Sequence, residues 1–138
     1  FNAADVDCVE KVMEATSGGV DYAFEVAGVV QAMETAYSIT KRGGVTVTSG
    51  LSHHQEKFEV PHAQLVLDER TIKGSFMGSS IVRHDVPRLI NLYKQGKLPI
   101  DKLRSGNIGL DDLNAGFDKL ASGDAVRQML VMHKEFDL

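Results

Sequence analysis

The strongest constraint on the fold is a set of three apolar segments that each close on a glycine. They lie at 22–28, 44–50 and 70–78, and segments with helical or mixed patterns separate them. Strands that alternate with helices in this way are typical of parallel sheets. The sequence therefore predicts an α/β fold, the second half of a doubly wound parallel sheet with flanking helices. We expect the carboxyl edge of that sheet, where the glycines lie, to stay open for a ligand.

Apolar residues at helical spacing, acidic starts and glycine stops predict the helices. We expect helices at 6–16, 29–40, 62–67, 85–96 and 111–122, and strands at 21–27, 44–49, 71–77 and 129–132. Aromatic and branched residues bounded by glycines favour burial of strand 21–27 on both faces. A loop is expected at 52–57, where the sequence is polar and has no period.

Several details of the helices can be predicted as well. Lys41 and Arg42 should complement the negative end of helix 29–40, and Gly43 should end that helix in the left-handed conformation. Asp85 is the expected cap of helix 85–96, with Pro87 in its first turn. The apolar stripes should be buried, and they consist of Val30, Met33 and Tyr37, then Val86, Leu89, Ile90 and Tyr93, then Leu113, Phe117 and Leu120.

Composition narrows the functional classes. The chain has 138 residues, 43% of them hydrophobic, and a net charge of −4, which suits one soluble domain or a piece of one. Basic residues are scattered among acids, so nucleic-acid binding is disfavoured. Cys8 is the single cysteine, which excludes an internal disulfide and favours the cytoplasm. No membrane span or signal peptide is predicted, and a start at Phe1 without Met leads us to interpret the chain as a fragment.

No self-contained catalytic or metal-binding set is predicted. His53 and His54 are adjacent on an expected loop, so their side chains should diverge, and no third ligand stands at a metal-binding spacing. Other histidines, including His133, are isolated in the sequence. Glu25 lies within a predicted buried strand, where its charge must find a partner or sit at a strand end that water reaches. We interpret Glu25 as structural rather than catalytic.

Five motifs in order carry a resemblance to a known family. They are VDYAFEVAG at 20–28, RGG at 42–44 with SGL at 49–51, TIKGS at 71–75, DVPRL at 85–89, and FDKL at 117–120 with Gly123 and Arg127. Together they resemble zinc-dependent alcohol dehydrogenases of the medium-chain family, over the end of the coenzyme domain and the closing segment. The resemblance implies that residues 1–138 are a partial Rossmann domain that binds NAD or NADP. The glycine-rich pyrophosphate motif, the acidic residue on the second strand, and the family's zinc ligands have no counterpart in this chain.

The resemblance also implies cofactor-binding residues on the nicotinamide side. The carbonyl groups of Ser49 and Ser75 would accept hydrogen bonds from the carboxamide, and the N–H of Met77 would donate one. Gly50 would let the coenzyme approach the main chain closely. Arg127 matches the position of an arginine on the pyrophosphate. The full set is Val26, Ala27, Ser49, Gly50, Leu51, Ser75, Phe76, Met77 and Arg127.

Each of these roles has a plainer alternative. Val26, Ala27 and Leu51 would be ordinary core residues, and Arg127 an ordinary solvated arginine. The glycines would only punctuate the elements, which is the reading we favour for Gly43 and Gly44.

The strand at 71–77 also predicts an interface. As the outer strand of the sheet it would offer unpaired backbone groups and the apolar residues Ile72, Phe76 and Met77 to a second copy. Members of the family form dimers through this edge, so we expect a homodimer through 72–77.

Three functions remain open at this point. The first is the nicotinamide-side part of a zinc-type alcohol dehydrogenase, inactive in isolation. The second is the same domain of a zinc-free quinone-type reductase, and the third is a non-enzymatic dimerisation module. A Gly-His-Glu zinc motif upstream would separate the first two.

Overall fold

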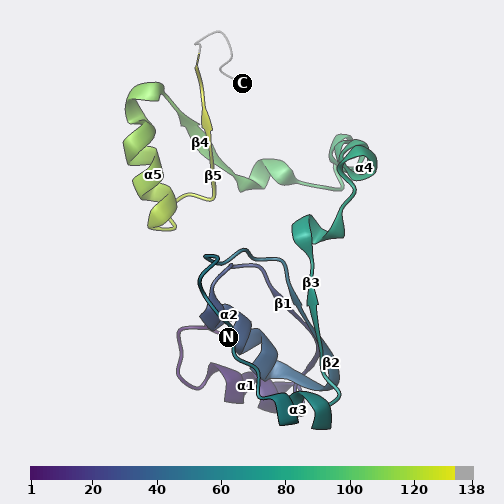
Figure 1. Ribbon diagram of the computed structural model, residues 1–138. Coiled ribbons are helices and arrows are strands. Elements are labelled where there is room, and N and C mark those ends of the chain that lie inside the picture. Colours follow the sequence, from purple (N-terminus) through teal and green to yellow (C-terminus); the bar gives the residue numbers. More distant parts are fainter. Residues whose placement is uncertain (133–138) are drawn as a thin grey trace. The chain divides into compact units, whose positions relative to one another are not determined.

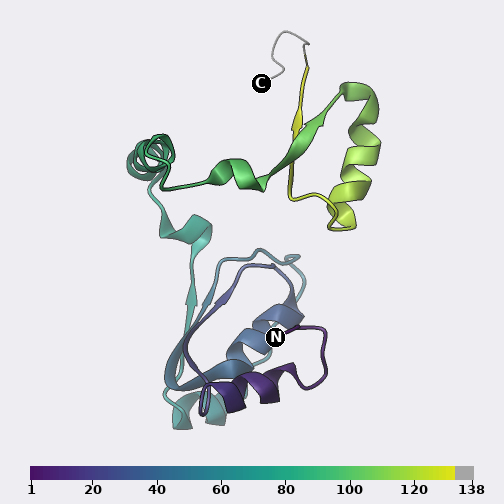
Figure 2. The same cartoon turned by 180° about the vertical axis from the view of Figure 1, so that it is seen from behind.

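The computed structural model describes residues 1–132 and divides the chain into two units (Figures 1 and 2). The first unit is Phe1–Ser80, and the second begins at Ile81. Each unit has a parallel sheet and flanking helices, so the predicted α/β fold is confirmed.

The first unit contains a three-stranded parallel sheet in the order β1-β2-β3. Its strands are β1 (Val20–Glu25), β2 (Thr40–Thr48) and β3 (Thr71–Gly74). Helix α1 (Cys8–Ala15) precedes β1, α2 (Val30–Ile39) connects β1 to β2, and α3 (His62–Leu67) leads into β3. Helix α3 has the predicted bounds, whereas α1 begins two residues later than expected.

The core of the first unit lies between the sheet and α2. Ala23 of β1 and Met33, Ala36 and Tyr37 of α2 are buried there. Burial alternates over the last four residues of β1: Ala23 and Glu25 are buried, whereas Tyr22 and Phe24 are about two-thirds exposed. The prediction that β1 is buried on both faces is therefore wrong for this chain. Aromatic and branched composition indicates a strand, but burial of the second face depends on what packs there.

The end of α2 differs from the prediction. The helix stops at Ile39, and residues 41–43 belong to β2. Thr40 is fully buried, and its hydroxyl contacts the carbonyl oxygen of Ala36 and the hydroxyl of Thr46, which draws the chain into the sheet. Gly43 does have a left-handed φ of 70°, but within β2, where the pairing register with β1 shifts.

Lys41 and Arg42 consequently do not cap the helix. Lys41 forms an ion pair with Asp21 on the neighbouring strand. Arg42 donates to the carbonyl oxygen of Leu67 and pairs with Asp68 after α3. Both side chains therefore tie β2 to its surroundings rather than to the helix dipole.

The second unit contains two parallel strands, β4 (Arg104–Ile108) and β5 (Arg127–Leu130). Its helices are α4 (Val82–Lys94) and α5 (Leu113–Ala121), with 3-10 turns at Ile100–Leu103 and Leu110–Asp112. Strand β4 was not predicted, because its sequence RSGNI has few apolar or branched residues. Strand β5 lies two residues before the predicted strand 129–132, and His133 lies outside the described residues.

Helix α4 starts three residues before the predicted cap. Asp85 is inside the helix and accepts a hydrogen bond from the N–H of Ile81 at 2.7 Å, so it caps from within. Pro87 lies past the first turn.

The apolar stripes of the second unit are not buried as expected. The exposed residues are Val86, Leu89, Ile90 and Tyr93 of α4, and Phe117 and Leu120 of α5. Periodicity identifies an apolar face, but it carries no information about what covers that face.

Candidate functional site

The carboxyl ends of the three strands in the first unit lie in register. Glu25 of β1 is the Cα partner of Thr48 of β2, and Thr48 is the partner of Gly74 of β3. The segments that follow these ends, 26–28, 49–51 and 75–77, therefore leave the sheet at one edge. Eight of the nine predicted cofactor-binding residues belong to these three segments.

Strand β3 ends earlier than predicted, and this changes the course of the chain at the edge. Met77, Gly78 and Ser79 all have positive φ values, of 50°, 68° and 56°. Consecutive left-handed residues cannot continue a strand, so the chain turns within a 3-10 segment, Phe76–Ser79. Phe76 and Met77 therefore lie in this turn and not in an edge strand.

Glu25 connects the first two strand ends. Its side chain is buried, with Oε1 accepting from the N–H of Gly28 and Oε2 from the hydroxyl of Thr48, both at 2.6 Å. The main-chain carbonyl of Glu25 accepts from the N–H groups of Ser49 at 2.9 Å and Gly50 at 3.3 Å. The Thr48 hydroxyl, helped by backbone N–H groups, lowers the pKa of Glu25 although burial opposes this. The sequence correctly indicated that this charge needs a partner.

Gly28 and Gly50 allow the two turns to touch. A Cβ on Gly50 would lie 2.6 Å from the Cα of Gly28 and from Oε1 of Glu25. A Cβ on Gly28 would lie 2.9 Å from the backbone N and O of Leu51, and Gly28 has a φ of 75°. The space beside Gly50 that the sequence assigned to coenzyme approach is thus occupied by the neighbouring turn of the same chain. For both residues the absence of a side chain is a packing requirement.

Apolar side chains surround this edge and are exposed. Leu51 is 87% exposed and Phe76 78%, and Val26, Ala27 and Met77 are also exposed. The alternative that Val26, Ala27 and Leu51 are core residues is therefore wrong in this structure. Main-chain polar groups beside exposed apolar side chains suit a flat, partly polar ring, so the residues present fit the nicotinamide end of a coenzyme.

A cavity of about 320 Å³ opens beside the same edge. Gly50 and Leu51 line it, together with residues of α2 and with Phe58 and Ile72. The remaining predicted residues do not line this cavity. The candidate site is accordingly the set of three strand ends, and the cavity is its flank towards α2.

Arg127 belongs to the second unit. It is the first residue of β5, is exposed, and is the Cα partner of Arg104. Its backbone N–H lies 3.3 Å from the hydroxyl of Ser105. Its predicted contact with pyrophosphate stays a prediction.

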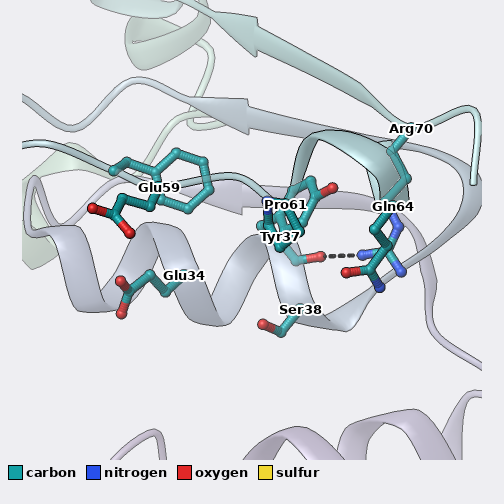
Figure 3. A pocket seen from close by; sticks show the side chains of 8 residues that line it. Glu34, Tyr37, Ser38, Glu59, Pro61, Gln64 and Arg70 are labelled. Carbon is teal, nitrogen blue, oxygen red and sulfur yellow. Dashed lines mark hydrogen bonds between the residues drawn. The ribbon is translucent and has the colours of Figure 1, made fainter. Parts of the chain in front are cut away.

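Another cavity, of about 440 Å³, lies between α2 and the segment that leads into β3 (Figure 3). Arg70 organises it: one terminal nitrogen donates to the carbonyl oxygen of Tyr37 at 2.8 Å, the other pairs with Asp68 at 2.9 Å, and the guanidinium carbon lies 5.0 Å from the centre of the Tyr37 ring. This network joins the end of α2 to the start of β3, and it was not predicted from the sequence. None of the predicted cofactor residues lines this cavity.

The described residues do not fit a metal ion. Within 1–132, no three His, Cys, Asp or Glu side chains gather so that they could hold one. The rings of His53 and His54 lie 4.4 Å apart rather than diverging, which corrects the expectation for that loop. A family zinc would therefore need ligands from outside the described residues.

No helix within residues 1–132 combines the length and apolar character that crossing a bilayer requires.

The sequence of this chain matches a known protein family and curated relatives. The family model described as zinc-binding dehydrogenase matches residues 1–95. Alcohol dehydrogenase 1 of Pisum sativum is 33% identical and that of Zea mays 34% identical over 124 residues, which is 89% of this chain and 32% of each relative. The chain thus spans about a third of the length of these curated relatives.

The fold of this chain is also similar to that of solved alcohol and butanediol dehydrogenase structures. Benzyl alcohol dehydrogenase from Acinetobacter calcoaceticus matches with a TM-score of 0.85 at 25% identity, over 96% of this chain and 36% of that one. The 2R,3R-butanediol dehydrogenase of Bacillus subtilis matches with a TM-score of 0.74 at 33% identity, over 95% and 37%. Because the family model covers more than half of its length, the chain belongs to the zinc-binding dehydrogenase family.

Proposed function

We propose that this chain forms the nicotinamide side of the coenzyme site in an NAD(P)-dependent alcohol dehydrogenase. The observation that carries the proposal is the register of Glu25, Thr48 and Gly74, which brings three strand ends with main-chain polar groups to one edge. Ligands of open parallel sheets bind beyond such strand ends. A solved structure from Sinorhizobium meliloti, which matches 83% of this chain at 27% identity with a TM-score of 0.69, holds bound NADP.

The chemistry of each segment suits the nicotinamide. The carbonyl groups of Ser49 and Ser75 would accept from the carboxamide, and the N–H of Met77 would donate to it. Val26, Ala27, Leu51 and Phe76 would form apolar walls around the ring and ribose, and Arg127 would bind the pyrophosphate. The coenzyme, when bound, carries the hydride that the reaction transfers. The role of this chain is to orient the ring.

Leu51 offers a direct test in the full-length gene product. Leu51→Ala removes an apolar wall, which should weaken NADH binding about tenfold because a lost contact of about 1.4 kcal/mol has that effect. Leu67→Ala is the matched control, since Leu67 is similarly exposed but lies at the end of α3. Fluorescence titration with NADH and NADPH measures both. Absence of binding to the unmodified protein, or equal effects of the two variants, would refute the proposal.

The ligand itself can be varied where the protein groups are backbone atoms. A coenzyme analogue with an acetyl group in place of the carboxamide lacks the N–H donors that Ser49 and Ser75 would accept from. It should bind about tenfold more weakly than the parent coenzyme, as expected for the loss of about 1.4 kcal/mol of hydrogen bonding. Equal affinities would show that these carbonyls are not used.

The zinc-type alternative is favoured over a zinc-free quinone reductase, because the family model and the curated relatives reported above are zinc-binding or alcohol dehydrogenases. We expect the zinc and its ligands to come from the remainder of a longer protein, and the isolated chain to be inactive. Zinc analysis and an alcohol oxidation assay on the full-length gene product test this.

We also propose that β3 pairs with a second copy. Within the described residues it is one of the two outer strands of the three-stranded sheet, β1 being the other. Ile72 of β3 is exposed, and so are Phe76 and Met77 in the turn that follows the strand. Exposed edges of this kind favour pairing between chains. Sedimentation of the full-length protein should give a dimer that Ile72→Lys dissociates, and an unchanged dimer would remove this interface.

A further inference from the structure

We propose that Glu25 is a positioning residue for the nicotinamide, acting through the two turns that it holds together. The inference rests on the proposed function, because it assumes that these turns contact the coenzyme. Glu25 itself is buried and need not touch the ligand.

Glu25 has a central place among the strand ends. It is the last residue of β1, and the turn with Val26 and Ala27 follows it directly. Its Oε1 atom accepts from the N–H of Gly28, which closes that turn back onto the strand. The position of both proposed ring contacts is therefore linked to the carboxylate.

The other contacts of Glu25 reach β2. Its Oε2 atom accepts from the hydroxyl of Thr48, the last residue of that strand, and its main-chain carbonyl accepts from the N–H groups of Ser49 and Gly50. Ser49 is the residue whose carbonyl is proposed to accept from the carboxamide. Thr48 extends the link to β3, because its main-chain carbonyl accepts from the N–H of Ser75 at 2.8 Å.

A carboxylate suits this position for a chemical reason. Its two oxygens are acceptors only, and the groups that face them are an N–H and an O–H, which both donate. The close packing leaves little freedom, since Gly50 and Gly28 touch beside the carboxylate. Removing one hydrogen bond should therefore shift the turns by a fraction of an ångström rather than unfold the unit, and such displacements are enough to weaken an oriented complex.

Thr48 gives the sharper variant, because Glu25→Gln can disturb folding. Thr48→Val keeps the shape of the side chain and removes the hydroxyl, whereas Thr48→Ser restores the hydroxyl. Thr46→Val is the matched control, since Thr46 lies two residues earlier on β2 and its hydroxyl binds Thr40, away from the edge. All four variants are made in the full-length protein.

The measurement compares NADH with ADP-ribose, which lacks the nicotinamide. We expect Thr48→Val and Glu25→Gln to raise the Kd for NADH five- to tenfold while the Kd for ADP-ribose changes less than twofold. Thr48→Ser should recover most of the NADH affinity, and Thr46→Val should leave the ratio of the two Kd values unchanged.

The outcomes separate the two levels of the proposal. Suppose that the unmodified protein binds NADH, but Thr48→Val leaves the ratio of the two Kd values unaltered, whether or not it raises both. Glu25 then has no positioning role, and only this inference fails. If the unmodified protein binds neither ligand, the proposed function fails and this inference with it.

Discussion

Substitution of Gly50 by alanine is the most direct test of how the two turns pack. The added Cβ would lie 2.6 Å from the Cα of Gly28 and from Oε1 of Glu25, and closer still to the backbone nitrogen of Gly28. Ordinary van der Waals contact needs 3.4 Å or more, so the turns must separate by about 1 Å. The atoms in the way are mainly backbone, which cannot rotate aside as a side chain end can.

The cost follows from two contributions. Overpacking of this kind typically costs about 1–3 kcal/mol, and weakening of the charge-assisted hydrogen bond between Gly28 and Glu25 adds about 1 kcal/mol. We therefore expect Gly50→Ala to destabilise the protein by about 3 kcal/mol. At roughly 2–4 °C per kcal/mol this lowers the melting temperature by roughly 6–12 °C.

Gly74→Ala is the matched control for this experiment. Gly74 ends the neighbouring strand, has no left-handed φ, and has no heavy atom within 4 Å of the position of an added Cβ. Its replacement should change stability by less than about 0.5 kcal/mol. Differential scanning calorimetry of the two full-length variants gives the comparison, and hydrogen exchange at the Ser49 and Gly50 amides localises the effect. A Gly50→Ala protein that melts with the unmodified one, or with Gly74→Ala, would refute the packing argument.

Three further predictions concern stability, each measured by thermal or urea unfolding. Glu69 has a φ of 50° just after α3, a left-handed conformation that glycine adopts without strain. Glu69→Gly should therefore stabilise the protein by up to about 1 kcal/mol, and a loss of stability would contradict the argument that the backbone is strained at Glu69. Thr40→Val leaves the buried Thr46 hydroxyl without its partner and should cost about 1–3 kcal/mol, whereas the double Thr40→Val, Thr46→Val variant should recover part of that loss. Because the folded-state pKa of Glu25 is lowered below its ordinary value of 4.5, its contribution to stability is present above about pH 4.5 and is lost as the pH falls through the folded pKa. Glu25→Gln should accordingly flatten the pH dependence of stability below pH 4.5, and an unchanged slope would contradict this.

The candidate site was only partly readable from the sequence. The order of the motifs predicted that Ser49, Gly50 and Ser75 belong to one site. The register of the strands places the segments that contain them at one edge of the sheet. The reason why Gly50 must be glycine could not be predicted from the sequence. An added Cβ at this position would collide with Gly28, which belongs to a different turn. The contact between Glu25 and Thr48 was unreadable for the same reason, since the two residues are 23 positions apart.

The sequence by itself determined the features that depend on local preference. Apolar runs closed by glycine specify the three strands in order, and helix α3 has the bounds that its sequence predicts. Even the need of Glu25 for a partner follows from its residue type and its strand position.

Only the tertiary structure decided the features that depend on distant partners. Strand β4 has a weak strand pattern and exists because β5 pairs with it. Lys41 to Gly43 join β2 instead of capping α2, since the buried Thr40 and Thr46 hydroxyls meet. The covering of an apolar stripe, as in α4, is likewise set by whatever packs against it. Local sequence records what a segment prefers, whereas burial and pairing are properties of two segments at once.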